Sequence, residues 1–114
     1  MKSGPPDGLE ARIRARLKQE GLSATRWSND AGAVYAVHQH PYAKVLYVLR
    51  GGITFALHEG RQSLTMGPGD RMDLPAGTPH SARVGPDGVV CLEAQRTGAA
   101  AQVLNRDIVS SEQR

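Results

Sequence analysis

The sequence predicts a single all-β domain with a short N-terminal α-helix. Its 114 residues fit one domain of ordinary size, and a hydrophobic content of 39% is enough for a folded core. Its 13 glycines and 7 prolines exceed the usual share and indicate many turns. From Thr25 onward, short apolar runs recur about every ten residues between these turns, which is typical of a β-sandwich or barrel.

The predicted helix covers residues 9–20. Its apolar residues are spaced four apart and form one stripe: Leu9, Ile13 and Leu17. Asp7 is suited to cap the N-terminus of this helix, and Gly21 is suited to end it. Arginines and lysines crowd the remaining positions, which predicts a solvated face. The alternative is an arm that packs on a partner subunit or binds an anion.

Turn-forming residues divide the rest of the chain into short strands. We expect these strands at 24–28, 33–39, 44–50, 52–58, 62–66, 70–74, 79–84 and 88–95, with a weaker one near 101–104. The turns at 50–52 and 86–88 contain glycines that accept a positive φ. We therefore expect residues 1–23 to form an arm and helix, 24–106 a β-barrel, and 107–114 a tail.

Charge and composition narrow the possible partners. The net charge of +3 favours small anionic ligands, whereas 4% aromatic residues and the lack of a nucleic-acid motif argue against a specific nucleic-acid binder. Cys91, the single cysteine, indicates a reducing compartment and excludes a four-cysteine zinc site. The sequence has neither an apolar run long enough to span a membrane nor a secretory signal, so we expect a cytoplasmic protein.

Three histidines are the candidate metal ligands. His38 and His40 lie two residues apart in a predicted strand, so both side chains project to one face. His80 follows a rigid proline- and glycine-containing turn, residues 75–79, that could direct it inward. Two imidazoles on one face and a third from another strand can bind one metal ion. The spacing of the pair alone is also compatible with a hydrogen-bonded surface pair.

The residues around these histidines resemble the two motifs of the cupin superfamily, with every spacing kept. The positions of the first motif are Gly32, His38, His40, Lys44 and Gly51. The positions of the second motif are Gly69, Pro75, Gly77, His80 and Val84. Eight of these ten positions have the residue that the motifs specify. The exceptions are Lys44, where the first motif has Glu, and Val84, where the second has Asn.

The resemblance implies a single-domain cupin jelly-roll β-barrel of the RmlC-like type. In such cupins the two histidines of the first motif, its Glu and the histidine of the second motif bind one divalent metal. By position, His38, His40 and His80 would be the ligands of one ion, which could be Fe, Mn, Zn, Ni or Cu. The resemblance also implies a homodimer.

Lys44 makes the expected site two charge units more positive than a Glu would. At about 5 Å and an effective dielectric constant near 20, its ammonium would oppose a divalent ion by roughly 6–7 kcal/mol. Lysine could swing outward on its long stem, which we expect, or stay inside in the deprotonated form. In the third alternative, the barrel holds no tight metal and Lys44 pairs with an anionic ligand.

Other side chains are candidates for the wall of the site. With Lys44, the phenols of Tyr42 and Tyr47 are candidate substrate-binding groups, and Tyr35 could line the same pocket. Cys91 and Glu93 share a parity on a late strand. If they face inward, a thiol and a carboxylate would stand near the metal, but we expect a core thiol with an outward carboxylate. The remaining three candidates are expected to lie away from the site, packed on an apolar surface or exposed: Trp27, His58 and Arg83.

Two functions from different classes follow. The first is a metal-binding cupin that acts on a small carboxylate or enolate-type substrate as a dioxygenase- or isomerase-like enzyme. The alternative is a non-catalytic ligand-binding or sensor cupin whose site is modified or free of metal because of Lys44. The partners expected in both cases are a small molecule and a second copy of the chain, with no nucleic acid and no membrane.

Overall fold

The structure is a computed structural model that describes residues 8–58 and 61–96. Helix α1 spans Leu9–Gln19. Six strands follow it in the described residues: β1 (Thr25–Asn29), β2 (Val34–His38), β3 (Ala43–Leu57), β4 (Gln62–Met66), β5 (Arg71–Leu74) and β6 (His80–Arg96). The all-β class and the N-terminal helix are confirmed. None of the described helical residues forms a segment that is long and apolar enough to cross a membrane.

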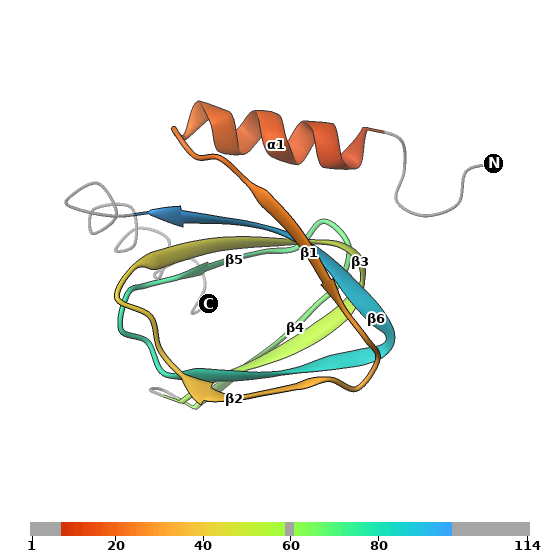
Figure 1. Cartoon of the computed structure of the whole chain (residues 1–114), viewed down its shortest axis with the longest axis vertical. Coiled ribbons are helices and arrows are strands. Elements are labelled where there is room, and N and C mark those ends of the chain that lie inside the picture. The colour runs from red at the N-terminus through yellow and green to blue at the C-terminus, as the bar shows by residue number, and fades with distance from the viewer. Residues whose placement is uncertain (1–7, 59–60, 97–114) are drawn as a thin grey trace.

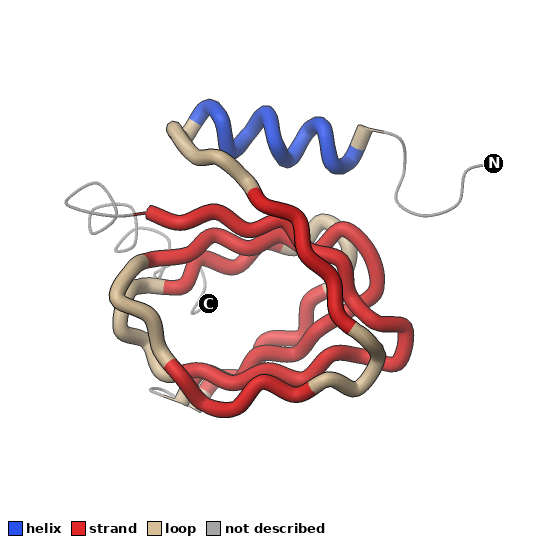
Figure 2. Tube along the Cα trace, viewed as in Figure 1, coloured by secondary structure: helices blue, strands red, loops and turns tan. Residues whose placement is uncertain are grey.

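The strands form two layers that share β3 and β6 (Figures 1 and 2). Residues 43–51 of β3 pair with residues 89–96 of β6, and β1 and β5 flank this first layer. Residues 53–57 of β3 pair with residues 80–84 of β6, and β2 and β4 flank the second layer. All of these pairs are antiparallel, as in a jelly roll. The described strands leave the sheet open, so the expected closed barrel is not formed by them.

The predicted breaks at 50–52 and 86–88 are bends within continuous strands. The register between β3 and β6 shifts at Arg50 and again before Ile53, which is typical of β-bulges. Gly51 and Gly88 have φ of 69° and 76° and lie against each other, so both strands bend at the same place. The weaker strand near 101–104 and the tail at 107–114 lie outside the described residues, and the domain boundaries stay predictions.

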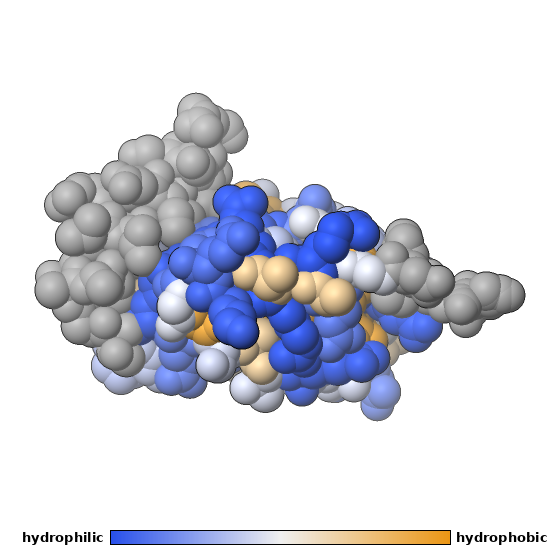
Figure 3. All heavy atoms as spheres, turned by 90° about the horizontal axis from the view of Figure 1, so that it is seen from above, coloured by the Kyte–Doolittle hydropathy of each residue, from blue (hydrophilic) through white to orange (hydrophobic). Residues whose placement is uncertain are grey.

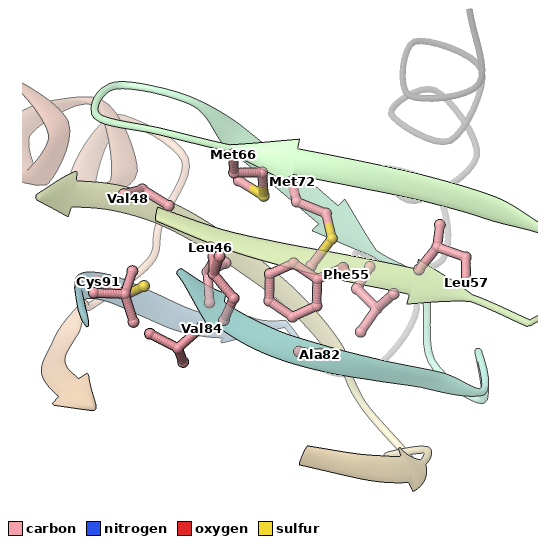
Figure 4. Packing of buried hydrophobic residues seen from close by; sticks show 12 residues of the cluster. Leu46, Val48, Phe55, Leu57, Met66, Met72, Ala82, Val84 and Cys91 are labelled. Carbon is pink, nitrogen blue, oxygen red and sulfur yellow. The ribbon is translucent and has the colours of Figure 1, made fainter. Parts of the chain in front are cut away.

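The main core lies between the two layers (Figure 4). Leu46, Val48 and Cys91 of the first layer point toward Phe55 and Val84 of the second. A second core lies on the outer face of the first layer, under α1 (Figure 1). The buried members of this second core are Ile13, Leu17, Val45, Tyr47, Leu49 and Leu92. Both faces of the first layer are therefore apolar.

Helix α1 places its apolar stripe on the sheet and its charges in solvent. Ile13 and Leu17 are buried, whereas the surface seen from the helix side is largely hydrophilic (Figure 3). Gly21 ends the helix with φ of 78°, as predicted. The expectation that Asp7 caps the helix is wrong, because the N-cap residue is Gly8, which has no side chain to accept a hydrogen bond.

A buried ion cluster joins the end of α1 to the first layer. We call it the Glu20 cluster; its members are Glu20, Tyr47, Arg71, Asp73 and Arg96. Arg71 donates from Nη1 and Nη2 to the two carboxylate oxygens of Glu20 at 2.7 and 2.9 Å. The hydrogen bonds from Arg71, helped by Arg96, outweigh burial and lower the pKa of Glu20 to about 2. Two carboxylates and two guanidiniums balance in charge, which makes their burial tolerable.

We predict that Gly51→Ala strongly destabilises the fold. A Cβ at Gly51 would lie 2.0 Å from the carbonyl oxygen of Gly88 and would stand at a positive φ. The free energy of unfolding should fall by about 3 kcal/mol or more in urea unfolding. Gly69→Ala is the control, because Gly69 also has a positive φ but a Cβ there meets nothing within 4 Å. Similar losses in the two variants would contradict a contact-driven effect.

We predict that Glu20 adds stability that disappears in acid. Its pKa is about 2 in the folded protein and ordinary when unfolded, so its contribution is complete above pH 4.5 and is lost as the pH falls toward 2. Glu20→Gln should therefore lower the free energy of unfolding by about 2 kcal/mol at pH 7 and by almost nothing at pH 2. Denaturant unfolding at several pH values checks this, with Glu10→Gln on the exposed side of α1 as control. A loss independent of pH would contradict the prediction.

Candidate metal centre

The cavity between the two layers is the candidate site. It has a volume of about 380 Å³ and is mainly apolar, with a small set of polar side chains on its wall. The polar, titratable and hydrogen-bonding residues among its lining are Trp27, Ser28, Tyr35, His38, His40, Lys44, His80 and Glu93. Apolar side chains from β3, β5 and β6 complete the lining. The cavity can hold a small molecule in contact with several convergent polar groups.

The three predicted histidines meet at this cavity. His38 at the end of β2 is in register with His80 at the start of β6, and His40 follows two residues later. The ring centroid of His38 lies 4.8 Å from that of His40 and 4.3 Å from that of His80. One nitrogen of each ring lies within 4.8 Å of the corresponding nitrogens of the other two. Pairing of β2 with β6 is thus what assembles the cluster.

The hydrogen bonds of the histidines leave suitable nitrogens for a metal. Nδ1 of His38 lies 2.7 Å from the carbonyl oxygen of Ala36, and Nδ1 of His80 lies 2.8 Å from that of Thr78. Carbonyl oxygens only accept, so each Nδ1 carries the hydrogen and each Nε2 keeps its lone pair. Nε2 of His40 is buried and has no hydrogen-bond partner in the described part of the chain. This donor set fits a divalent metal ion, which would use all three nitrogens.

The surroundings of His40 and His80 favour the neutral form of imidazole, which is the form that binds metals. Burial lowers the pKa of His40, and the charges of Lys44 and His38 lower it further. Burial also lowers the pKa of His80, more than its hydrogen bond to the Thr78 carbonyl raises it. Neutral imidazoles at pH 7 need not lose a proton before they bind an ion.

Lys44 and Glu93 both line the cavity, which corrects two expectations. Lys44 does not swing outward: its Nζ lies 3.4 Å from Oε1 of Glu93, and its side chain is only 15% exposed. Glu93 does not face solvent either, because it has the same strand parity as the buried Cys91 and projects to the inner face. Trp27 donates from Nε1 to the same Glu93 oxygen at 3.0 Å. The site therefore contains a lysine together with a carboxylate from another strand.

The three tyrosines are placed differently from one another. Tyr35 lines the cavity, and its hydroxyl group accepts a hydrogen bond from Asn29. Tyr42 stacks on His40, with 5.1 Å between ring centroids, and is not among the residues that line the cavity. Tyr47 lies on the opposite face of β3 and accepts a hydrogen bond from Arg71 in the Glu20 cluster. The prediction that Tyr47 lines the pocket is therefore wrong, because side chains alternate along a strand and this one points to the outer face.

The remaining four candidate residues lie in the core, at the surface and on the cavity wall. Cys91 is fully buried in the main core, and burial raises the pKa of its thiol to about 12, so it is no nucleophile at neutral pH. His58 and Arg83 are exposed, as expected. Trp27, expected only to pack on an apolar surface, lines the cavity and packs against the core.

The sequence reasoning considered an inward Glu93 but preferred an outward one, and it missed Trp27 as a site residue. The signal available was strand parity, since a core position for Cys91 requires an inward Glu93 two residues later. The apolar outer face hid this signal, because Leu92 and Ala94 on that face are as buried as Cys91. Trp27 pairs with Cys91 across β1 and β6, a register that the sequence does not reveal.

Comparisons with known proteins agree with this fold. The chain is 42% identical over 53 residues to the dimethylsulfoniopropionate lyase DddQ of Ruegeria pomeroyi; these are 46% of this chain and 26% of that protein. The crystal structure of this lyase is similar with a TM-score of 0.61 and 31% identity, covering 68% of this chain and 39% of the lyase chain. The chain thus spans only about a quarter of the curated relative and two fifths of its solved chain.

Two further solved structures have the same fold. KdgF from Halomonas sp. is 29% identical with a TM-score of 0.56, covering 68% of this chain and 71% of its own. A variant of the oxalate decarboxylase from Bacillus subtilis is 26% identical with a TM-score of 0.58, covering 68% of this chain and 22% of its own. The family model described as "Cupin domain" matches residues 26–92, more than half of the sequence. The chain therefore belongs to the cupin family.

Proposed function

We propose that this cupin binds one divalent metal ion through three histidines and takes a small carboxylate into the adjoining cavity. The observation that carries the proposal is the convergence of three imidazole nitrogens on a mainly apolar cavity whose wall also contains a lysine. His38, His40 and His80 would hold the ion and leave coordination positions open for a ligand. Imidazole accepts most first-row ions, so Fe, Mn, Zn, Ni and Cu are all candidates.

The chemistry of the wall supports an anionic substrate. When bound, a divalent ion would act as a Lewis acid on a carboxylate oxygen. Lys44 provides an ammonium group in the same cavity, and although it is paired with Glu93, it can donate to an anion held at the metal in the mainly apolar surroundings. Two of the similar proteins are named for carboxylates, dimethylsulfoniopropionate and oxalate. A lyase-, isomerase- or dioxygenase-like reaction on such a substrate is the activity that we propose.

One observation favours a second candidate, a ligand-binding or sensor cupin without tight metal. Lys44 lies inside the cavity, where its positive charge acts on His40 and His80. In this alternative the anion would pair with Lys44, and the imidazoles would serve as hydrogen-bonding groups. Metal content separates the two candidates.

The assembly and location of the protein stay predictions. A homodimer would need an apolar contact surface, and Val34 and Val37 of β2 are large hydrophobic residues that are 63% and 55% exposed.

We predict that His40→Ala removes metal binding without unfolding the protein. The variant loses a ligand and also the buried, unpartnered Nε2, so apo stability should change little. Zn²⁺ affinity, measured by competition with a chromophoric chelator, should fall at least about 100-fold. His58→Ala is the control, since His58 is exposed and hydrogen-bonded to Ser81 outside the cluster. Retained stoichiometric metal in His40→Ala would overturn the ligand set.

We predict that Lys44 gives the cavity its preference for carboxylates. Calorimetry of the Zn²⁺-loaded protein should show tighter binding of dimethylsulfoniopropionate than of its methyl ester, which lacks the negative charge. Lys44→Met should reduce this preference about tenfold or more, because a partly buried charge pair is lost. An unchanged preference would contradict the role of Lys44. Proton NMR of the same mixtures reports turnover as loss of the substrate signals.

A further inference from the structure

Glu93 is a buried carboxylate that the metal site does not use directly. It lies on β6, where it is paired with Leu46 and stands two residues before Gln95, the partner of Lys44, and its side chain is 19% exposed. Its Oε1 is in contact with both Lys44 Nζ, at 3.4 Å, and Trp27 Nε1, at 3.0 Å. Its oxygens do not join the group of nitrogens that lie within 4.8 Å of one another. Glu93 is thus fixed by neighbours from β1 and β3 rather than by the histidines.

The position of Glu93 matters because the neighbouring Lys44 stands where the first cupin motif has Glu. The acidic residue expected there would attract a divalent ion, whereas Lys44 repels it. A carboxylate beside Lys44 cancels most of this repulsion, because opposite charges in contact act at a distance as a dipole. The Trp27 N–H bond holds Glu93 at the wall of the cavity and, through it, the Lys44 ammonium.

We propose that Glu93 is a positioning residue that offsets the charge of Lys44 and so allows the three histidines to bind a divalent ion. The proposal rests on the proposed function, since it assumes that the cluster binds metal. It assigns the missing negative charge of the cupin motif to a different strand, β6 in place of β3. Glu93 acts by its charge beside Lys44 and is not itself a ligand, so the loss of its charge should be offset when the charge of Lys44 is removed as well.

The test is a double-substitution cycle read out as Zn²⁺ and Co²⁺ affinity of the full chain by chelator competition. Glu93→Gln leaves the charge of Lys44 unopposed and should lower the affinity for both ions about 30- to 100-fold. Lys44→Met leaves the carboxylate unopposed and should strengthen binding by a similar factor. The double variant carries neither charge and should return to within about threefold of the wild type. Glu10→Gln, which removes an exposed carboxylate on α1, should change nothing.

Each outcome decides between specific explanations. If Glu93→Gln binds as tightly as the wild type, the proposal is overturned and the proposed function stands. If the double variant is as weak as Glu93→Gln, the charge of Lys44 does not oppose the ion, and the proposal also fails. A wild type without metal overturns the proposed function and this proposal together. If Glu93→Gln does not fold, the comparison of the double variant with Lys44→Met decides: the double variant should bind the ions more weakly, and equal affinities overturn the proposal.

Discussion

The shared bend of β3 and β6 is the constraint on which the rest of the structure depends. Each strand is too long to stay in one layer, and the two cross from one layer to the other where Gly51 and Gly88 meet. The crossing creates two facing layers from one pair of strands and leaves the cavity between them. It also places His80 at the N-terminal end of β6 in the second layer, where β2 can bring His38 beside it.

Because side chains alternate along these strands, the two faces of the first layer have different roles. On the outer face, Tyr47 and Leu92 support α1 and the Glu20 cluster. On the inner face, Lys44 and Glu93 enter the cavity. The same strands therefore carry the attachment of the helix and the electrostatics of the site. The Glu20 cluster lies on the outer face of the first layer, away from the groups that enter the cavity.

Sequence reasoning predicted the features that depend on local spacing. The turn residues gave most strand positions, and the motif spacings identified the three histidines that the structure brings together. It failed at Glu93, because both faces of its strand are apolar and alternation then says nothing about direction. It failed at Lys44, because an outward direction was expected from repulsion by the metal ion, and the contact with Glu93 that offsets this charge is not visible in the sequence. It also failed at 50–52 and 86–88, since a glycine that ends a strand and a glycine that bends one look alike in sequence.

The contact between Lys44 and Glu93 has an evolutionary consequence. The two residues lie on paired strands, far apart in the chain, and each is mostly shielded from solvent by its surroundings. A lineage that changed only one of them would have to fold with an unpaired charge in the cavity, which is costly in an apolar setting. We therefore expect Lys44 and Glu93 to be replaced mainly together, with one substitution following soon after the other. Among relatives, the two positions are expected to co-vary, with an acidic residue at one accompanied by a neutral residue at the other.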